Sequence, residues 1–286
     1  MTDTLATKDM TAELVKIEQL AVELADIAGS EITKALGGLL AIKYKTSATA
    51  ESDAEKLRWR DPVSEVDGCV ETIIRKKVAE HFSGHDIIGE EMTERPGRDH
   101  DYIWAVDPID GTTNFINGFP MFAASIGVLH RCRPVAAAVW CSTSHALRSG
   151  VYHASLGGKL RFDGADVTPK ANPAVRRRLA GVPKVTGEDL HWDTRKTGSA
   201  ALECALVAAG LLQVARFETP NIWDVAGGIA LVQAAGGTVR WHDGKAWAPM
   251  GVFAPGRDPD GKPDLRYWRG GILVGTPAAV DKMAAL

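Results

Sequence analysis

The sequence predicts a layered α/β or α+β fold, and three observations lead to this prediction. Two amphipathic helical stripes come first, a series of short β-favouring runs follows, and strands and helices alternate in the last third of the chain. Such elements bury their apolar faces by stacking in layers. Because the 286 residues contain no internal repeat and no Pro/Gly-rich linker, we expect one domain over 1–286, with halves at 1–165 and 166–286.

The N-terminal half is expected to begin with two helices. The first is predicted over residues 11–36, where apolar residues recur at steps of three and four positions before a pair of glycines. Residues 43–61 are polar and charged without periodicity, which predicts an exposed loop. A second helical stripe begins near Asp67 and ends at Gly84.

Strands are predicted from the β-favouring runs that follow. A short strand over 86–88 leads directly into Glu90, and a second over 102–106 ends abruptly in a tight turn at 107–111. Residues 123–152 form successive runs broken by turn-forming residues, which predicts an antiparallel meander. Two strands thus deliver acidic residues at their C-terminal ends.

The C-terminal half alternates strands and helices. The expected elements are a strand near Leu179, a helix over 199–209, a strand over 212–217, a helix over 223–235, a hairpin that turns at Asp243-Gly244, and a strand over 272–274 that leads into a terminal helix.

The charge balance argues against a nucleic-acid partner. Thirty-three basic residues stand against 36 acidic ones, which gives a formal net charge of −3 without long runs of one sign. An anionic ligand would therefore need a local device, such as a metal ion or a helix N-terminus.

Cysteine usage and the N-terminal residues predict a cytoplasmic location. The four cysteines form no C-x-x-C pair and lie among apolar neighbours, which predicts buried thiols in a reducing compartment. The N-terminus shows no basic start followed by an apolar run, and no stretch approaches the roughly 18 apolar residues of a membrane helix. We therefore expect no membrane partner.

Residues 107–113, DPIDGTT, carry the strongest chemical signal. Two carboxylates three positions apart at the end of an apolar strand repel one another unless a cation lies between them. Such oxygen ligands suit magnesium, which keeps positions open for water and phosphate. The backbone N–H groups of Gly111, Thr112 and Thr113 would face an anion. An ordinary Asp-rich turn is the alternative interpretation of these residues taken alone.

Two further carboxylates add to this segment. Glu90 follows a predicted strand and a glycine, and Asp224 lies at the start of an apolar helix. For Asp224, capping of that helix is the alternative role.

Together these segments resemble the inositol monophosphatase family of magnesium-dependent, lithium-sensitive phosphatases. The resemblance covers nearly the whole chain, and its motifs are IGEE at 88–91, WAVDPIDGTTNFINGFP at 104–120 and WDVAGGIALVQAAGG at 223–237. It implies an αβαβα sandwich of the inositol monophosphatase/fructose-1,6-bisphosphatase type. It also implies a homodimer.

The resemblance implies two magnesium ions, with a weaker third ion near Glu90. Glu90, Asp107 and the carbonyl of Ile109 would hold the first ion. Asp107, Asp110 and Asp224 would hold the second. Glu90 is thereby expected to be catalytic as well as metal-binding.

The resemblance also implies a catalytic pair and a basic loop residue. Thr112 resembles the family threonine that, hydrogen-bonded to an acidic partner matching Asp67, orients and activates the attacking water. Lys56 lies at the family spacing for a loop lysine near the metals, and Arg58 and Arg60 are its rivals for that role.

Substrate contacts are implied in two segments. Gly198, Ser199 and Ala200 match the segment that lines the site for the substrate hydroxyls. Glu218 resembles the acidic residue that binds inositol hydroxyls. The stretch after Glu218 is one residue shorter than is usual in the family and contains the stiff Pro220.

The sequence therefore predicts a magnesium-dependent phosphatase that hydrolyses a small phosphate monoester, with inositol 1-phosphate as the first candidate. Histidinol phosphate and a 3′-phosphorylated adenosine nucleotide are the alternatives within the same superfamily. A non-catalytic regulator or RNA-polymerase-associated binding protein that keeps the fold is the alternative from another class. The cost of clustering four carboxylates argues against that alternative.

Overall fold

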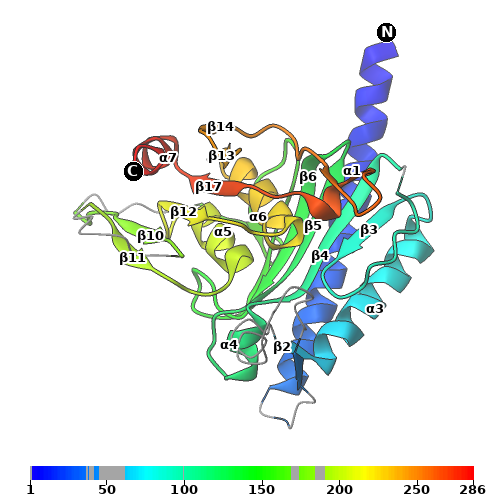
Figure 1. The fold of residues 1–286 in the computed structure, drawn as a ribbon, viewed down its shortest axis with the longest axis horizontal. Helices are drawn as coiled ribbons and strands as arrows, with labels where there is room; N and C mark the ends of the chain where they lie inside the picture. Colours follow the sequence, from blue (N-terminus) through cyan, green and yellow to red (C-terminus); the bar gives the residue numbers. More distant parts are fainter. Residues whose placement is uncertain are drawn as a thin grey trace.

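The computed structural model describes most of the chain (Figure 1). The described residues are 2–36, 38, 42–44, 62–98, 100–168, 174–183 and 191–286. The helices are α1 (Thr2–Ala35), α3 (Glu65–His81), α4 (Thr112–Ile116), α5 (Ala200–Ala208), α6 (Ile222–Ala234) and α7 (Pro277–Ala284), with a 3-10 turn, η1 (Leu265–Tyr267).

The larger sheet has the strand order β3-β4-β5-β6-β7-β8-β9. Only β3 and β4 run parallel; each of the other neighbouring pairs is antiparallel, which confirms the predicted meander. The strands are β3 (Asp86–Gly89), β4 (Tyr102–Asp110), β5 (Ala123–His130), β6 (Arg133–Cys141), β7 (Gly150–Ser155), β8 (Arg161–Phe162) and β9 (Ala165–Asp166).

The smaller sheet has the order β11-β10-β12-β17-β13-β14. Its strands are β11 (Asp193–Arg195), β10 (Leu179–Gly181), β12 (Val214–Phe217), β17 (Gly271–Gly275), β13 (Thr238–His242) and β14 (Trp247–Pro249). Two strand pairs lie outside these sheets: β1 (Ile42–Tyr44) with β2 (Pro62–Ser64), and β15 (Gly256–Arg257) with β16 (Pro263–Asp264).

These elements stack in five layers, which confirms the predicted layered α/β sandwich. Helices α1 and α3 cover one face of the larger sheet, and α5 and α6 lie between the two sheets (Figure 1). Helix α7 covers the outer face of the smaller sheet. The site residues described below come from the α5–α6 layer and from elements on both sides of it.

Strand β4 illustrates how the sequence specifies this layering. All nine of its residues are buried, because helices cover both faces. Trp104 and Val106 face α1 and α3, whereas Ile103 and Ala105 face α5 and α6. Burial of a large apolar side chain contributes roughly 1.5–3 kcal/mol, so this strand stabilises both interfaces at once.

Some elements differ from the sequence predictions. Helix α1 begins at Thr2, nine residues before the predicted start, because backbone hydrogen bonds propagate a helix beyond its apolar stripe. Part of the predicted loop over 43–61 belongs to β1, since pairing with β2 satisfies its backbone groups. Residues 45–61 lie outside the described residues.

The cysteine prediction is half right. All four cysteines are described and free, and Cys141 and Cys204 are buried as expected. Cys69 is exposed on α3, and Cys132 is only partly buried, because it lies in the turn between β5 and β6 beside the exposed Arg131 and Arg133. Among the helices that the structure describes, none combines the length and apolar character needed to cross a bilayer.

Candidate active site

Strand β4 extends through the acidic segment instead of ending before it. Asp107 pairs with Ser125 and Asp110 with Ala123, and the register shifts between the two pairs. This β-bulge accommodates the intervening proline, which has no N–H to donate to a ladder. The predicted tight turn at 107–111 is therefore wrong in its extent, because bulged strand pairing reaches as far as Asp110.

The chain turns at Gly111, whose φ of +90° favours glycine. A Cβ at this position would lie 3.1 Å from the carbonyl oxygen of Met121. Helix α4 begins immediately afterwards, with Thr112 half-buried and Thr113 exposed. The backbone of this turn is therefore crowded on the side of Met121 and open towards Thr112 and Thr113.

Asp107 is a buried carboxylate of the site with one oxygen unpaired in the described part of the chain. It is 2% exposed, and its Oδ1 atom has no hydrogen-bond partner among the described residues. Burial, followed by the negative charges of Glu90, Asp110 and Asp224, raises the pKa of Asp107 well above its ordinary value. A buried carboxylate with an unpaired oxygen is costly unless a cation compensates it.

Asp110 connects β4 to the start of α5. Its Oδ2 accepts hydrogen bonds from Ser199 Oγ at 2.6 Å and from the backbone N–H of Ala201 at 2.5 Å. Burial nevertheless raises the pKa of Asp110 to about 6. Ser199 is also the N-cap of α5, since its Oγ accepts from Leu202 N at 3.2 Å.

Asp67 and Thr112 lie together, as the resemblance implies. Asp67 is fully buried. Its Oδ2 accepts two hydrogen bonds from Ser64, one from the backbone N–H at 3.0 Å and one from the side-chain hydroxyl at 2.5 Å. Its Oδ1 accepts from Thr112 Oγ1 at 3.3 Å, and that hydroxyl also lies 2.9 Å from the carbonyl oxygen of Ile109. Burial raises the pKa of Asp67 to about 6.

Glu90 follows β3, where its N–H donates to the carbonyl of Val106 in β4. The next residues are held by Glu71 of α3, which accepts from Glu91 N at 2.7 Å and from Met92 N at 3.1 Å. Gly89 allows this approach, because a Cβ there would lie 2.0 Å from Glu71 Oε1. The charge of Glu90 contributes to the raised pKa values of Asp67, Asp107 and Asp110.

Asp224 occupies the third position of α6. Its Oδ2 accepts from the N–H of Asn221 at 2.8 Å, which completes a capping box. The capping role is thus present, and the charge of Asp224 also reaches Asp107. The two roles are compatible, because a carboxylate has two oxygens with several acceptor positions.

A cleft of about 320 Å³ adjoins the acidic cluster. Its lining residues include Asp110, Lys196, Gly198, Ser199, Ala200, Glu203, Arg216, Glu218 and Asp224. The structure thus brings the predicted substrate residues of two segments beside two of the predicted metal ligands. A larger cavity of about 710 Å³ lies between α1 and β7 and contains none of the predicted site residues.

The loop that carries Gly198 is held by Asn114 of α4. Asn114 of α4 donates from Nδ2 to the carbonyls of Met121 at 2.6 Å and Thr197 at 2.7 Å. Gly198 has a φ of +83°, and a Cβ there would lie 3.1 Å from Asn114 Nδ2. The asparagine of the DGTTN motif therefore joins α4 to the opposite wall of the cleft.

Sequence reasoning missed two charged residues of the cleft. Glu203 is buried in α5, accepts from Thr197 N at 3.0 Å and Oγ1 at 2.8 Å, and has its pKa raised by burial to about 7. Its signal was a single acid in the apolar run AALECALVA. Arg216 pairs with Glu218 across 2.9 Å, and no periodic pattern indicates this contact. Lys56, Arg58 and Arg60 lie outside the described residues.

The donor set fits a hard cation. Among the residues that the structure describes, no three Asp, Glu, His or Cys side chains lie close enough to hold a metal ion as they stand. The unpaired Oδ1 of Asp107 and the three carboxylates that raise its pKa nevertheless mark a place where positive charge is stabilised. Oxygen ligands of this kind suit magnesium.

Comparison with known proteins identifies the family of the chain. The inositol monophosphatase family model matches residues 13–265. The chain is 34% identical over 223 residues to the Nus factor SuhB of Escherichia coli. The aligned region covers 71% of this chain and 79% of that protein. It is 33% identical over 205 residues to the chloroplastic phosphatase IMPL1 of Arabidopsis thaliana, covering 64% of this chain and 54%, about half, of that longer relative.

Solved structures show the same architecture. The extragenic suppressor protein suhB of Bartonella henselae superimposes with a TM-score of 0.69 at 25% identity, over 94% of this chain and 97% of that one. The family match, the relatives and the shared fold agree with one another. The chain therefore belongs to the inositol monophosphatase family, whose members depend on metal ions, and it is a phosphatase of that family.

Proposed function

We propose that this phosphatase is magnesium-dependent and hydrolyses a small phosphate monoester, with inositol 1-phosphate as the first candidate substrate. The observation that carries the proposal is the buried Asp107, whose Oδ1 has no hydrogen-bond partner among the described residues and whose pKa is raised by three neighbouring carboxylates. A divalent cation compensates such a cluster and presents positive charge to a phosphate.

The proposed ligands come from three elements and their ends. Glu90, Asp107 and the Ile109 carbonyl would hold one Mg²⁺, and Asp107, Asp110 and Asp224 a second, with a weaker third near Glu90. Bound Mg²⁺ would supply positive charge beside the phosphate oxygens and make water more acidic. The hydrogen bonds from Ser199 and Asn221 fix the orientations of Asp110 and Asp224 for this task.

Thr112 and Asp67 are proposed to position the attacking water. Asp67 is fixed by two hydrogen bonds from Ser64 and accepts the hydroxyl proton of Thr112. With its proton directed to Asp67, the Thr112 oxygen presents lone pairs towards the water and orients it for in-line attack. Phosphoryl transfer depends mainly on such positioning and on charge stabilisation.

The phosphate oxygens are proposed to face the turn before α4. The first-turn N–H groups of a helix have no partners within that helix. Gly111, Thr112 and Thr113 provide such groups beside Asp110. This arrangement would hold the phosphate next to the proposed cations.

The far end of the cleft favours a second class of substrate. Glu218 would bind inositol hydroxyls, but Arg216 pairs with it at 2.9 Å, and Lys196 lines the same cleft. Two cationic side chains in one cleft suit a substrate that carries a second anionic group, such as fructose 1,6-bisphosphate or adenosine 3′,5′-bisphosphate. These bisphosphates are the second candidate.

A substrate panel tests the proposal. Phosphate release with Mg²⁺ is measured from inositol 1-phosphate, histidinol phosphate, fructose 1,6-bisphosphate and adenosine 3′,5′-bisphosphate. If the second anion contacts Arg216, Arg216→Met raises KM for bisphosphates by about 10- to 100-fold, because one hydrogen bond to a charged group contributes about 1.5–3 kcal/mol. Arg240→Met is the control, since Arg240 of β13 pairs with Asp281 outside the cleft.

The panel also separates the enzyme from a binding protein. If the protein released no phosphate from any of the monoesters with Mg²⁺, a non-catalytic regulatory role would replace the enzymatic proposal. The relative named Nus factor SuhB makes that outcome worth testing.

Four finer expectations complete the proposal. We propose inhibition by lithium, a homodimer, a cytoplasmic location and the absence of a nucleic-acid partner. Activity against LiCl concentration, light scattering after size-exclusion chromatography, cell fractionation and an RNA-binding titration measure them in that order.

A further inference from the structure

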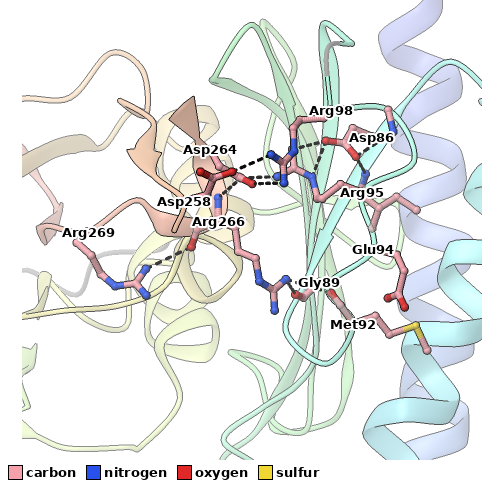
Figure 2. Close-up of polar contacts among 12 residues, drawn as sticks. Asp86, Gly89, Met92, Glu94, Arg95, Arg98, Asp258, Asp264, Arg266 and Arg269 are labelled. Atoms are coloured by element: carbon pink, nitrogen blue, oxygen red, sulfur yellow. Dashed lines mark hydrogen bonds and ion pairs between the residues drawn. The ribbon is translucent and has the colours of Figure 1, made fainter. Parts of the chain in front are cut away.

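Arg266 of η1 contacts the backbone on which Glu90 lies. Its guanidinium donates to the carbonyl oxygens of Gly89, of Glu90 at 3.2 Å and of Met92 at 3.0 Å. Figure 2 shows the Arg266 side chain reaching Gly89 from the η1 segment. One side chain from late in the sequence therefore fixes three carbonyls around Glu90.

The same guanidinium contacts the segment of Asp224. Its Cζ atom lies 5.0 Å from the centre of the Trp223 ring, within the range of a cation–π contact. Trp223 is 7% exposed and immediately precedes Asp224 in α6. Arg266 thus lies between the two segments that carry Glu90 and Asp224.

Buried ion pairs hold Arg266 in this position. Asp264 accepts from the backbone N–H of Arg266 at 2.8 Å. Arg95 bridges Asp264 to Asp86 at the start of β3 (Figure 2). The side chains of all three residues are at most 5% exposed. Breaking a buried pair leaves an uncompensated charge, so this chain of contacts resists displacement.

We propose that Arg266 is a positioning residue that sets the separation of Glu90 and Asp224, and so the affinity of the site for Mg²⁺. The inference rests on the proposed function. The hydrogen bond from Arg266 to Glu90 goes to the backbone carbonyl, so this bond directs the residue without occupying its carboxylate. An arginine suits this role, because its planar fork serves several carbonyls while its face stacks on an indole ring.

The loop has a second support, so loss of Arg266 is expected to change metal binding more than folding. Arg75 of α3 donates to the carbonyls of Met92 at 3.0 Å and Glu94 at 2.9 Å. Glu71 holds the N–H groups of Glu91 and Met92. These contacts remain in a variant at position 266.

The test is isothermal titration of the full chain with Mg²⁺ in the absence of substrate. Partners of metal ligands typically change metal affinity by about 10- to 100-fold when mutated, so Arg266→Met is expected to weaken Mg²⁺ binding by that factor. Arg266→Lys keeps the charge without the guanidinium fork, and its Mg²⁺ affinity is expected to lie between those of Arg266→Met and wild type. Arg269→Met is the matched control, because Arg269 is exposed and, among the described residues, its guanidinium donates to the backbone carbonyls of Arg266 and Trp268 rather than to the segment of Glu90. It is expected to bind Mg²⁺ like wild type.

The outcomes separate this inference from the proposed function. The inference is overturned if the Mg²⁺ dissociation constant of Arg266→Met stays within about threefold of the wild-type value, since partners of metal ligands typically change it by more than that. If Arg266→Met does not fold, as judged by its melting curve in EDTA, Arg266→Lys decides by the same threshold. A wild-type protein that binds no Mg²⁺ contradicts the proposed function instead.

Discussion

At Asp107, burial and three neighbouring negative charges act on a carboxylate whose Oδ1 has no hydrogen-bond partner among the described residues. By contrast, Asp67 and Asp110 each accept two or more hydrogen bonds, and their pKa values rise only to about 6. The comparison identifies Asp107 as the carboxylate that most needs a cation.

Thr112 is predicted to affect catalysis more than metal affinity. Thr112→Val removes the hydroxyl that faces Asp67 and Ile109, and loss of such positioned proton handling typically costs about 10²- to 10⁴-fold in rate. Thr112→Ser keeps the hydroxyl and is expected to retain most activity. Measurement of kcat together with the Mg²⁺ dissociation constant checks this, and a Val variant with unchanged kcat would refute the role.

Single residues of the site were partly predictable. The acidic motif at 107–113 and Glu90 could be found because strand ends and clustered carboxylates leave a local pattern. The use of the Ser199 hydroxyl by Asp110 could not, since it joins positions 89 residues apart. Contacts of that kind depend on packing rather than on local sequence.

Among the elements, α6 is placed by direct contact with β5. A Cβ on Gly127 of β5 would lie 2.4 Å from the backbone N of Gly227, and a Cβ on Gly227 would lie 2.9 Å from Ser125 Oγ. Ser125 is also the strand partner of Asp107. This close crossing therefore sets where the start of α6, with Asp224, lies relative to β4.

Gly127→Ala is predicted to destabilise the fold. The added methyl group overlaps backbone atoms of α6, and overpacking of this kind costs about 1–3 kcal/mol in the free energy of unfolding. Gly68→Ala in α3 is the control, because nothing lies within 4 Å of its Cβ and alanine stabilises a helix interior by roughly 0.5–1 kcal/mol relative to glycine. Urea unfolding measures both, and a neutral Gly127→Ala would contradict the close packing.

Most helices and sheet strands were predictable, whereas η1, β11 and the β15–β16 pair were not. Strand β11, Asp193–Arg195, has no apolar alternation and exists through its parallel pairing with β10. The η1 segment is fixed by Asp264 and its buried arginine partner. Such elements are stabilised by partners distant in sequence, so local propensity does not indicate them.

At the scale of the whole molecule, α5 and α6 join the two halves. Their buried side chains form one core with residues of both sheets, from Ile88 to Val274. We propose on this basis that residues 1–286 form a single domain. Expectations about dimerisation and the substrate concern surfaces and cleft chemistry, which composition and periodicity do not specify.

Stability without metal is predicted to fall as the pH rises. Burial raises the pKa of Asp67 from 3.8 to about 6 and that of Glu203 from 4.5 to about 7. Both groups therefore bind more protons in the folded than in the unfolded state between pH values of about 4 and 7, and the free energy of unfolding decreases across that window.

Glu203→Gln isolates one of these contributions, because its amide oxygen can still accept from Thr197. The free energy of unfolding of the variant, measured relative to that of wild type, is expected to rise by about 2 kcal/mol between pH 5 and pH 8, since each pKa unit corresponds to about 1.4 kcal/mol. Denaturant unfolding in EDTA at the two pH values measures this. If the free energies of unfolding of variant and wild type differ by the same amount at both pH values, Glu203 does not titrate in this range.

The most direct test of the magnesium site is phosphate release by Asp107→Asn as a function of Mg²⁺ concentration, with the best substrate of the panel. Phosphate release by wild type is expected to depend on Mg²⁺ and to be lost in EDTA. The rate of phosphate release by Asp107→Asn is expected to be at least about 100-fold lower than that of wild type, because the charge that holds the metal is removed. Asp260→Asn, at an exposed turn, is expected to match wild type. Full magnesium-dependent activity in Asp107→Asn would contradict the account.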